Sequence, residues 1–226
     1  MLRDVDLSQR ASLAKLRARL IEQTRREPAL TRSQLLLRQI LVMSAAVLTS
    51  LLIFGWVGGV RSGPRPLALV LQTTFGSGAL ALGSAIVAFG RGRSMLGRPR
   101  SWLLALIVLT PMALFSCRVL SVRFPLMTAE WHGRPGLRCF ALSGALALAP
   151  LFGVLWLRRG TDPVHPRSTA AALAATVGAG SWVLVDLWCP VGFVPHLLLG
   201  HVLPLLLLIA LGATLGARLV SFKPRR

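Results

Sequence analysis

The sequence has few charged residues and little polar chain outside its first 38 residues. Charged side chains make up 15% of the 226 residues and hydrophobic ones 54%, which is far from the composition of a soluble globular domain. The polar segment at 1–38 is too short to form an enzyme domain. Any function must therefore use the membrane, the short loops or this N-terminal arm. We expect no enzymatic activity and no cofactor.

A cleavable secretion signal is also missing. The first 38 residues carry charges throughout, and the apolar run that follows has the length of a full span without a small-residue cleavage site. We therefore expect the arm to remain attached to the membrane part of the protein.

Six apolar segments, each about as long as a bilayer is thick, fill most of the chain. They lie at 39–60, 67–90, 102–120, 137–157, 169–190 and 195–220. A hydrocarbon core of ~30 Å is crossed by ~20 apolar residues in a helix, and these segments are too long and too evenly apolar for barrel strands. The sequence predicts an all-α polytopic membrane protein. It would have a cytoplasmic arm at 1–38, a six-helix transmembrane bundle at 39–220 and a tail at 221–226.

The basic residues are distributed unevenly between the two sides of this predicted bundle. Twenty of the 26 Lys and Arg residues fall in the arm, in the loops 91–100 and 158–168, and in the last nine residues. Five fall on the opposite side, and Arg118 lies inside the third span. The positive-inside rule then places both termini in the cytoplasm. The net charge of +19 is thereby explained by topology, and we expect the lipid bilayer, not nucleic acid, as a partner.

The arm contains a predicted amphipathic helix at 7–27. Leu13, Leu16 and Leu20 share one side at helical spacing, and basic residues lie mostly elsewhere. An apolar stripe on so short a helix must be covered by the protein's own loops, by the membrane surface or by a partner. An interfacial helix on anionic lipid and a helix docked in a partner's groove both fit this pattern.

The predicted topology gathers reactive side chains at the face opposite the cytoplasm. These are Cys117, Cys139, Cys189, His132, His196 and His201, in the outer loops and the outer ends of the spans. In a Gram-negative envelope that face is oxidising. Thiolates and imidazoles suit a soft to borderline metal ion, whereas two cysteines can instead form a reversible disulfide. A cysteine alone can also be a small apolar packing residue.

The spacing of these residues matches no CxxC or HxxxH motif. His196 and His201 are five residues apart, or ~140° around a regular helix. They would share one ion only if the sixth span began irregularly, which Pro195 and Pro204 favour.

An acidic residue stands inside the fifth span. Trp182, Asp186 and Cys189 occupy positions i, i+4 and i+7, and therefore one helix face. A charge within a span is costly and normally faces the bundle interior. Arg118, one turn from the end of the third span, is the predicted partner of Asp186. Such a pair either contributes to function or only fixes helix packing.

Several short motifs in the C-terminal two thirds resemble those of one known family. Cys139 begins the fourth span, which continues through Pro150 to LWLRRG at 155–160. There follow AAALAATVGAG at 170–180, DLWCP at 186–190, HLLLGHVLP at 196–204 and LGATLGARL at 211–219. With REPALTRSQLLLR at 26–38, this order resembles the NrsF-type six-span membrane anti-sigma factors, which are negative regulators of extracytoplasmic-function sigma factors.

The resemblance implies a mechanism. The arm would sequester an extracytoplasmic-function sigma factor, and periplasm-facing cysteines, corresponding to Cys139 and Cys189, would sense metal or oxidative stress. The family often has His before the second cysteine, where this chain has Trp188. That departure favours thiol oxidation or hydrophobic sensing over a His–Cys metal pair. The expected signal-sensing residues are Cys139, Cys189, Asp186, His196 and His201, and the expected partner-binding residues are Leu13, Leu16 and Leu20.

Two other classes of membrane protein remain as alternatives. An intramembrane serine hydrolase would use Ser143 and His201, but Ser143 follows Ala141 and Leu142, not the small-residue approach that such a nucleophile needs. Ser143 is better explained by helix packing. A small-molecule or ion transporter would show internal repeats and a polar site at the bilayer midplane, and neither is evident here.

Overall fold

The computed structural model describes residues 31–60, 67–89, 99–120, 136–159, 164–189, 191 and 193–221, and every element within them is a helix. The first five are α2 (Arg32–Trp56), α3 (Leu67–Phe89), α4 (Arg100–Leu120), α5 (Leu137–Leu157) and α6 (Pro166–Trp188). The last is composite: α7 (Val194–Leu197), the π-helical η3 (Leu198–Val202), α8 (Leu203–Leu211), the π-helical η4 (Gly212–Gly216) and α9 (Ala217–Val220). The predicted all-helical class is confirmed. The predicted arm helix and its leucines lie outside the described residues.

Among the residues that the structure describes, five helices are long and apolar enough to cross a membrane. They are Ser33–Trp56, Arg100–Val119, Leu137–Leu157, Pro166–Trp188 and Val194–Val220. In α3 the apolar helix is shorter and runs from Val70 to Ile86. The structure therefore supports a membrane protein, while the predicted count of six spans stays a prediction because of α3.

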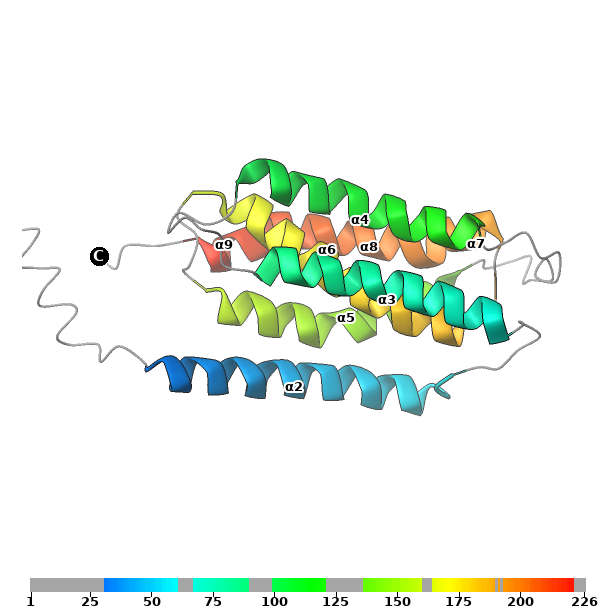
Figure 1. Ribbon diagram of the computed structural model, residues 1–226, viewed down its shortest axis with the longest axis horizontal. Helices are drawn as coiled ribbons and strands as arrows, with labels where there is room; N and C mark the ends of the chain where they lie inside the picture. Colours follow the sequence, from blue (N-terminus) through cyan, green and yellow to red (C-terminus); the bar gives the residue numbers. More distant parts are fainter. Residues whose placement is uncertain are drawn as a thin grey trace, which may run out of the picture. The chain divides into compact units, whose positions relative to one another are not determined.

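The chain divides into two compact units, Met1–Leu41 and Val42–Arg226. In the second unit α6 packs against α3, α4, α5 and α8. Small residues make this possible, because they let helix backbones approach closely where apolar lipid gives little driving force for association. A Cβ atom on Gly212 would lie 2.6 Å from the Ala170 carbonyl oxygen, and one on Gly216 would lie 3.1 Å from the Ala170 Cβ. Consecutive helices run in alternating directions (Figure 1), so α5 begins where α6 ends.

Pro150 leaves one carbonyl of α5 without its usual N–H donor, and a serine side chain of α2 binds that carbonyl. Proline has no N–H for the carbonyl four residues earlier. For Pro150 that carbonyl belongs to Leu146, and the Ser50 hydroxyl of α2 donates to it at 2.8 Å. Membrane helices tolerate proline where such side chains satisfy the freed carbonyl. Pro150 thus creates an attachment point on α5 for α2.

Candidate metal centre

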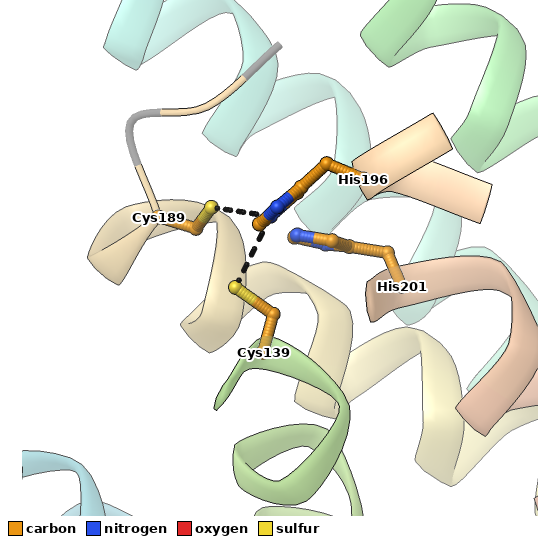
Figure 2. Close-up of side chains that lie close together, drawn as sticks. All are labelled: Cys139, Cys189, His196 and His201. Carbon is orange, nitrogen blue, oxygen red and sulfur yellow. Dashed lines mark hydrogen bonds between the residues drawn. The ribbon is translucent and has the colours of Figure 1, made fainter. Parts of the chain in front are cut away.

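Four side chains from three segments converge at the end of the bundle where α5 begins and α6 ends. They are Cys139, Cys189, His196 and His201, all buried, with one ligand atom from each lying within 4.8 Å of the others. The His196 Nε2 is 3.3 Å from the Cys139 Sγ and 3.2 Å from the Cys189 Sγ. Figure 2 shows the two sulfur atoms and the two imidazole rings pointing toward one another.

Cys189 reaches this point because α6 ends there. The residue before a proline avoids the helical region, and Cys189, which precedes Pro190, is extended with φ −95° and ψ 112°. Its N–H still donates to the Val185 carbonyl at 2.7 Å. The thiol therefore lies at the end of a rigid helix, on the same buried face as Trp182 and Asp186, as their spacing predicts.

A π-helical segment brings the two histidines together. The sequence predicts that His196 and His201 cannot share an ion on a regular helix, but the π-helical η3 begins two residues after His196 and includes His201. In a π-helix residue i bonds to residue i+5, so residues five apart come onto the same side. The two imidazole rings are 5.7 Å apart between centroids, and Trp182 meets the His201 ring edge-on at 5.2 Å. The irregular start that Pro195 and Pro204 favour is thus present.

Close backbone contact places Cys139 beside the histidines. Gly136 precedes α5 with φ 79°, a conformation that glycine adopts at little steric cost. A Cβ atom on Gly200 would lie 3.0 Å from both the Cys139 Cβ and the Gly136 carbonyl oxygen. The Ser143 hydroxyl donates to the Gly200 carbonyl at 3.4 Å, which Pro204, four residues on, cannot do. Ser143 therefore serves helix packing, as predicted.

The predicted ion pair between α4 and α6 is present. The Arg118 Nε lies 3.1 Å from the Asp186 Oδ1, and both side chains are buried. The Arg118 Nη2 also donates to the carbonyls of Cys189 at 3.5 Å and of Val191 at 3.3 Å. Arginine suits this position because its fork presents several donors in fixed directions. Asp186 is thus a partner of Arg118, not a member of the four-residue cluster, and the pair holds the chain on both sides of Pro190.

The four ligand-type atoms fit a tetrahedral Cys₂His₂ metal site. Zinc bonds of ~2.3 Å to sulfur and ~2.0–2.1 Å to nitrogen place neighbouring ligand atoms roughly 3.3–3.8 Å apart. The two sulfur-to-nitrogen distances already lie near that range. Both ring nitrogens of His201 are buried without a hydrogen-bond partner among the described residues, a costly arrangement for a polar group. A metal ion would satisfy His201 and neutralise two buried thiolates.

The structure brings together four of the five expected sensing residues, which form the four-residue cluster. The fifth, Asp186, instead pairs with Arg118. Cys117 is half-buried on α4 and lies outside the cluster. The roles of Trp182 and Trp188 were missed by sequence reasoning: Trp182 packs on His201, and the Trp188 Nε1 donates to the Val57 carbonyl of the α2 end at 3.2 Å. For Trp188, the one sign in the sequence that it lies near the cluster is its position next to Cys189.

Comparison with protein families identifies the chain. A family model described as NrsF, negative regulator of sigma F, matches residues 21–222. The chain belongs to the NrsF family. No curated protein and no solved structure matches it. The match confirms the resemblance read from the short motifs and implies a sigma factor as the partner of this NrsF-family protein. The four-residue cluster lies within the matched region.

Proposed function

We propose that this NrsF-family protein sequesters an extracytoplasmic-function sigma factor on its N-terminal arm and releases it when an envelope signal reaches the four-residue cluster. One observation carries the proposal: Cys139, Cys189, His196 and His201 offer four ligand atoms within 4.8 Å of one another. Family membership supports the regulatory role. The protein would act by binding, without a catalytic step.

A soft or borderline metal ion is the signal that these donors fit best. Two thiolates and two imidazoles suit Zn²⁺, Cd²⁺ or Cu⁺. Oxidation to a disulfide would need only the two sulfur atoms, whereas here the His196 Nε2 lies within 3.3 Å of both. This geometry favours coordination, although Trp188 stands where the family often has a histidine.

The proposed topology has six spans, with α3 as the second, and both termini in the cytoplasm of the bacterial inner membrane. The basic arm, loops and C-terminus support it. The metal centre would then lie at the outer ends of the spans. A metal ion from the periplasm could reach it without crossing the bilayer.

Reporter fusions test this topology. Alkaline phosphatase is expected to be active when fused at Gly133 and inactive when fused after Arg226, because the enzyme folds only where disulfides form. A cytoplasmic fluorescent reporter should give the reverse pattern. Phosphatase activity from the C-terminal fusion would refute the assignment.

The arm is tested by placing charges on its leucine stripe. Leu16→Asp combined with Leu20→Asp is expected to weaken binding of the sigma factor at least tenfold, because an unpaired charge buried in an apolar groove costs several kcal/mol and ~1.4 kcal/mol is tenfold in affinity. Co-purification from membranes, followed by titration of the sigma factor that is recovered, measures the effect. The matched control is Ala11→Asp combined with Ala18→Asp, which adds the same two charges on the opposite face of the predicted helix. Equal retention of the sigma factor by the leucine variant and wild type would contradict arm binding.

A further inference from the structure

The last residue of α6, Trp188, connects the candidate metal centre to α2. Its indole N–H donates to the Val57 carbonyl at 3.2 Å, and the next residue in the chain is Cys189. Phe54 of α2 packs in the same apolar cluster as Cys139, Trp188 and Cys189. The end of α2 is therefore attached to the residues that carry both sulfur ligands.

The Val57 carbonyl is available because α2 ends just before it. The helix stops at Trp56, and Gly58 and Gly59 follow with φ 109° and 60°, which glycine accommodates at little steric cost. The Gly59 N–H donates back to a carbonyl of α2 at 2.9 Å. The last carbonyls of a helix lack partners within the helix, so the indole of Trp188 satisfies a group that would otherwise be unpaired.

Elsewhere α2 buries little of its surface against the rest of the protein. In an apolar stretch of 18 residues only 11% is buried in α2, against 78% in α6. A cavity of about 340 Å³ is lined by residues of α2, α3, α5 and α6. Midway along the helix, the Ser50 hydroxyl binds the Leu146 carbonyl of α5. Because packed interiors resist displacement, a helix with little buried surface beside a cavity is the one that can shift.

We infer that Trp188 is a positioning residue that transmits the state of the metal centre to α2. This inference rests on the proposed function, since it requires a metal at the four ligands and a sigma factor on the arm. Metal binding replaces the direct contact between the Cys189 sulfur and His196 with bonds to the ion, which changes the position of Cys189, and Trp188 moves with it. The hydrogen bond to Val57 then displaces the end of α2. Because α2 begins at Arg32, within the N-terminal arm, metal and sigma factor become coupled through two packings of one helix.

Trp188→Phe tests the inference, with Trp56→Phe as the matched control. Phenylalanine retains an aromatic ring but removes the indole donor. Trp56 lies at the same end of α2, one residue from Val57, and its side chain is 88% exposed. The full-length proteins are reconstituted in nanodiscs with the sigma factor that co-purifies with the wild type. Affinity for Zn²⁺ and affinity for the sigma factor, with and without Zn²⁺, are then measured for each.

The expected result separates metal binding from its transmission. Zn²⁺ should weaken sigma binding by about 5- to 150-fold in wild type and Trp56→Phe, the usual range of such coupling. In Trp188→Phe the weakening should be less than about twofold, with zinc affinity and zinc-free sigma affinity close to wild type. A full zinc effect in Trp188→Phe overturns the inference alone. No zinc effect in wild type overturns the proposed function as well.

Hydrogen exchange on the unaltered protein provides a second measurement, should Trp188→Phe fail to fold. Zn²⁺ should change the exchange of backbone amides at 53–60, where α2 ends, and should leave those of 103–110 in α4 unchanged. Unchanged exchange at 53–60 in zinc-bound protein would refute transmission through this end of α2.

Discussion

Replacing Cys189 with serine is expected to lower the affinity for Zn²⁺ by roughly 100-fold or more. Structural zinc sites bind with ~10–16 kcal/mol, so one of four ligands accounts for about 2.5–4 kcal/mol, and ~1.4 kcal/mol is tenfold. Serine is nearly isosteric with cysteine, so the packing around the site is preserved, but it offers no thiolate to the metal. Cys139→Ser should have a similar effect, because its sulfur lies at nearly the same distance from the His196 Nε2. Competition titration against a chromogenic chelator, under reducing conditions, gives the affinities.

Cys117→Ser is the matched control, since this half-buried thiol on α4 lies outside the cluster. It should bind zinc like wild type. In cells, the Cys139→Ser and Cys189→Ser strains should give constitutive or uninducible output from the sigma-dependent promoter under zinc, cadmium or copper stress. Wild-type zinc affinity in both variants would show that the cysteines are packing residues. Induction by a thiol oxidant, with none by metals, would instead point to a disulfide.

Replacing Arg118 with alanine is expected to lower the free energy of unfolding by ~3–5 kcal/mol, because Asp186 is left as an uncompensated buried charge. The guanidinium lies 3.1 Å from the Asp186 carboxylate, and both side chains are at most 4% exposed. The substitution also removes the donor to the carbonyls of Cys189 and Val191. The end of α6 should therefore loosen, and zinc affinity should fall by about 10- to 100-fold, as for groups that orient metal ligands.

Unfolding in detergent, followed by circular dichroism, measures the stability. Arg100→Ala is the control, since Arg100 is the exposed first residue of the same helix. Combining Arg118→Leu with Asp186→Leu should restore most of the lost stability, because removing both charges of a buried pair is often close to neutral. It should not restore zinc affinity, because the carbonyls of Cys189 and Val191 still lack their donor. Equal stability of Arg118→Ala and Arg100→Ala would show that the pair contributes nothing measurable.

Much of the architecture followed from the sequence because membrane insertion depends on the length of each apolar segment and on the charges within it. Apolar length predicted most helix bounds within a few residues, since a helix must match the bilayer, but α2 begins at Arg32, seven residues before the predicted first span and inside the predicted arm. The pairing of Asp186 with Arg118 followed from the cost of a lone charge inside a span. The fifth span, predicted to reach residue 190, ends at Trp188, because the residue before a proline avoids the helical region. The gathering of cysteines and histidines at one end followed from alternating helix directions alone.

Contacts between distant segments were beyond the sequence. The convergence of His196 and His201 involves η3, whose Gly200 lies in close contact with Gly136 and Cys139. Nor could sequence alone reveal that Trp188 binds the Val57 carbonyl, 131 positions away. Spacing along one chain determines which residues share a helix face. Which faces meet is decided by close packing and by the requirement that buried polar groups find partners, and only the tertiary structure satisfies both at once.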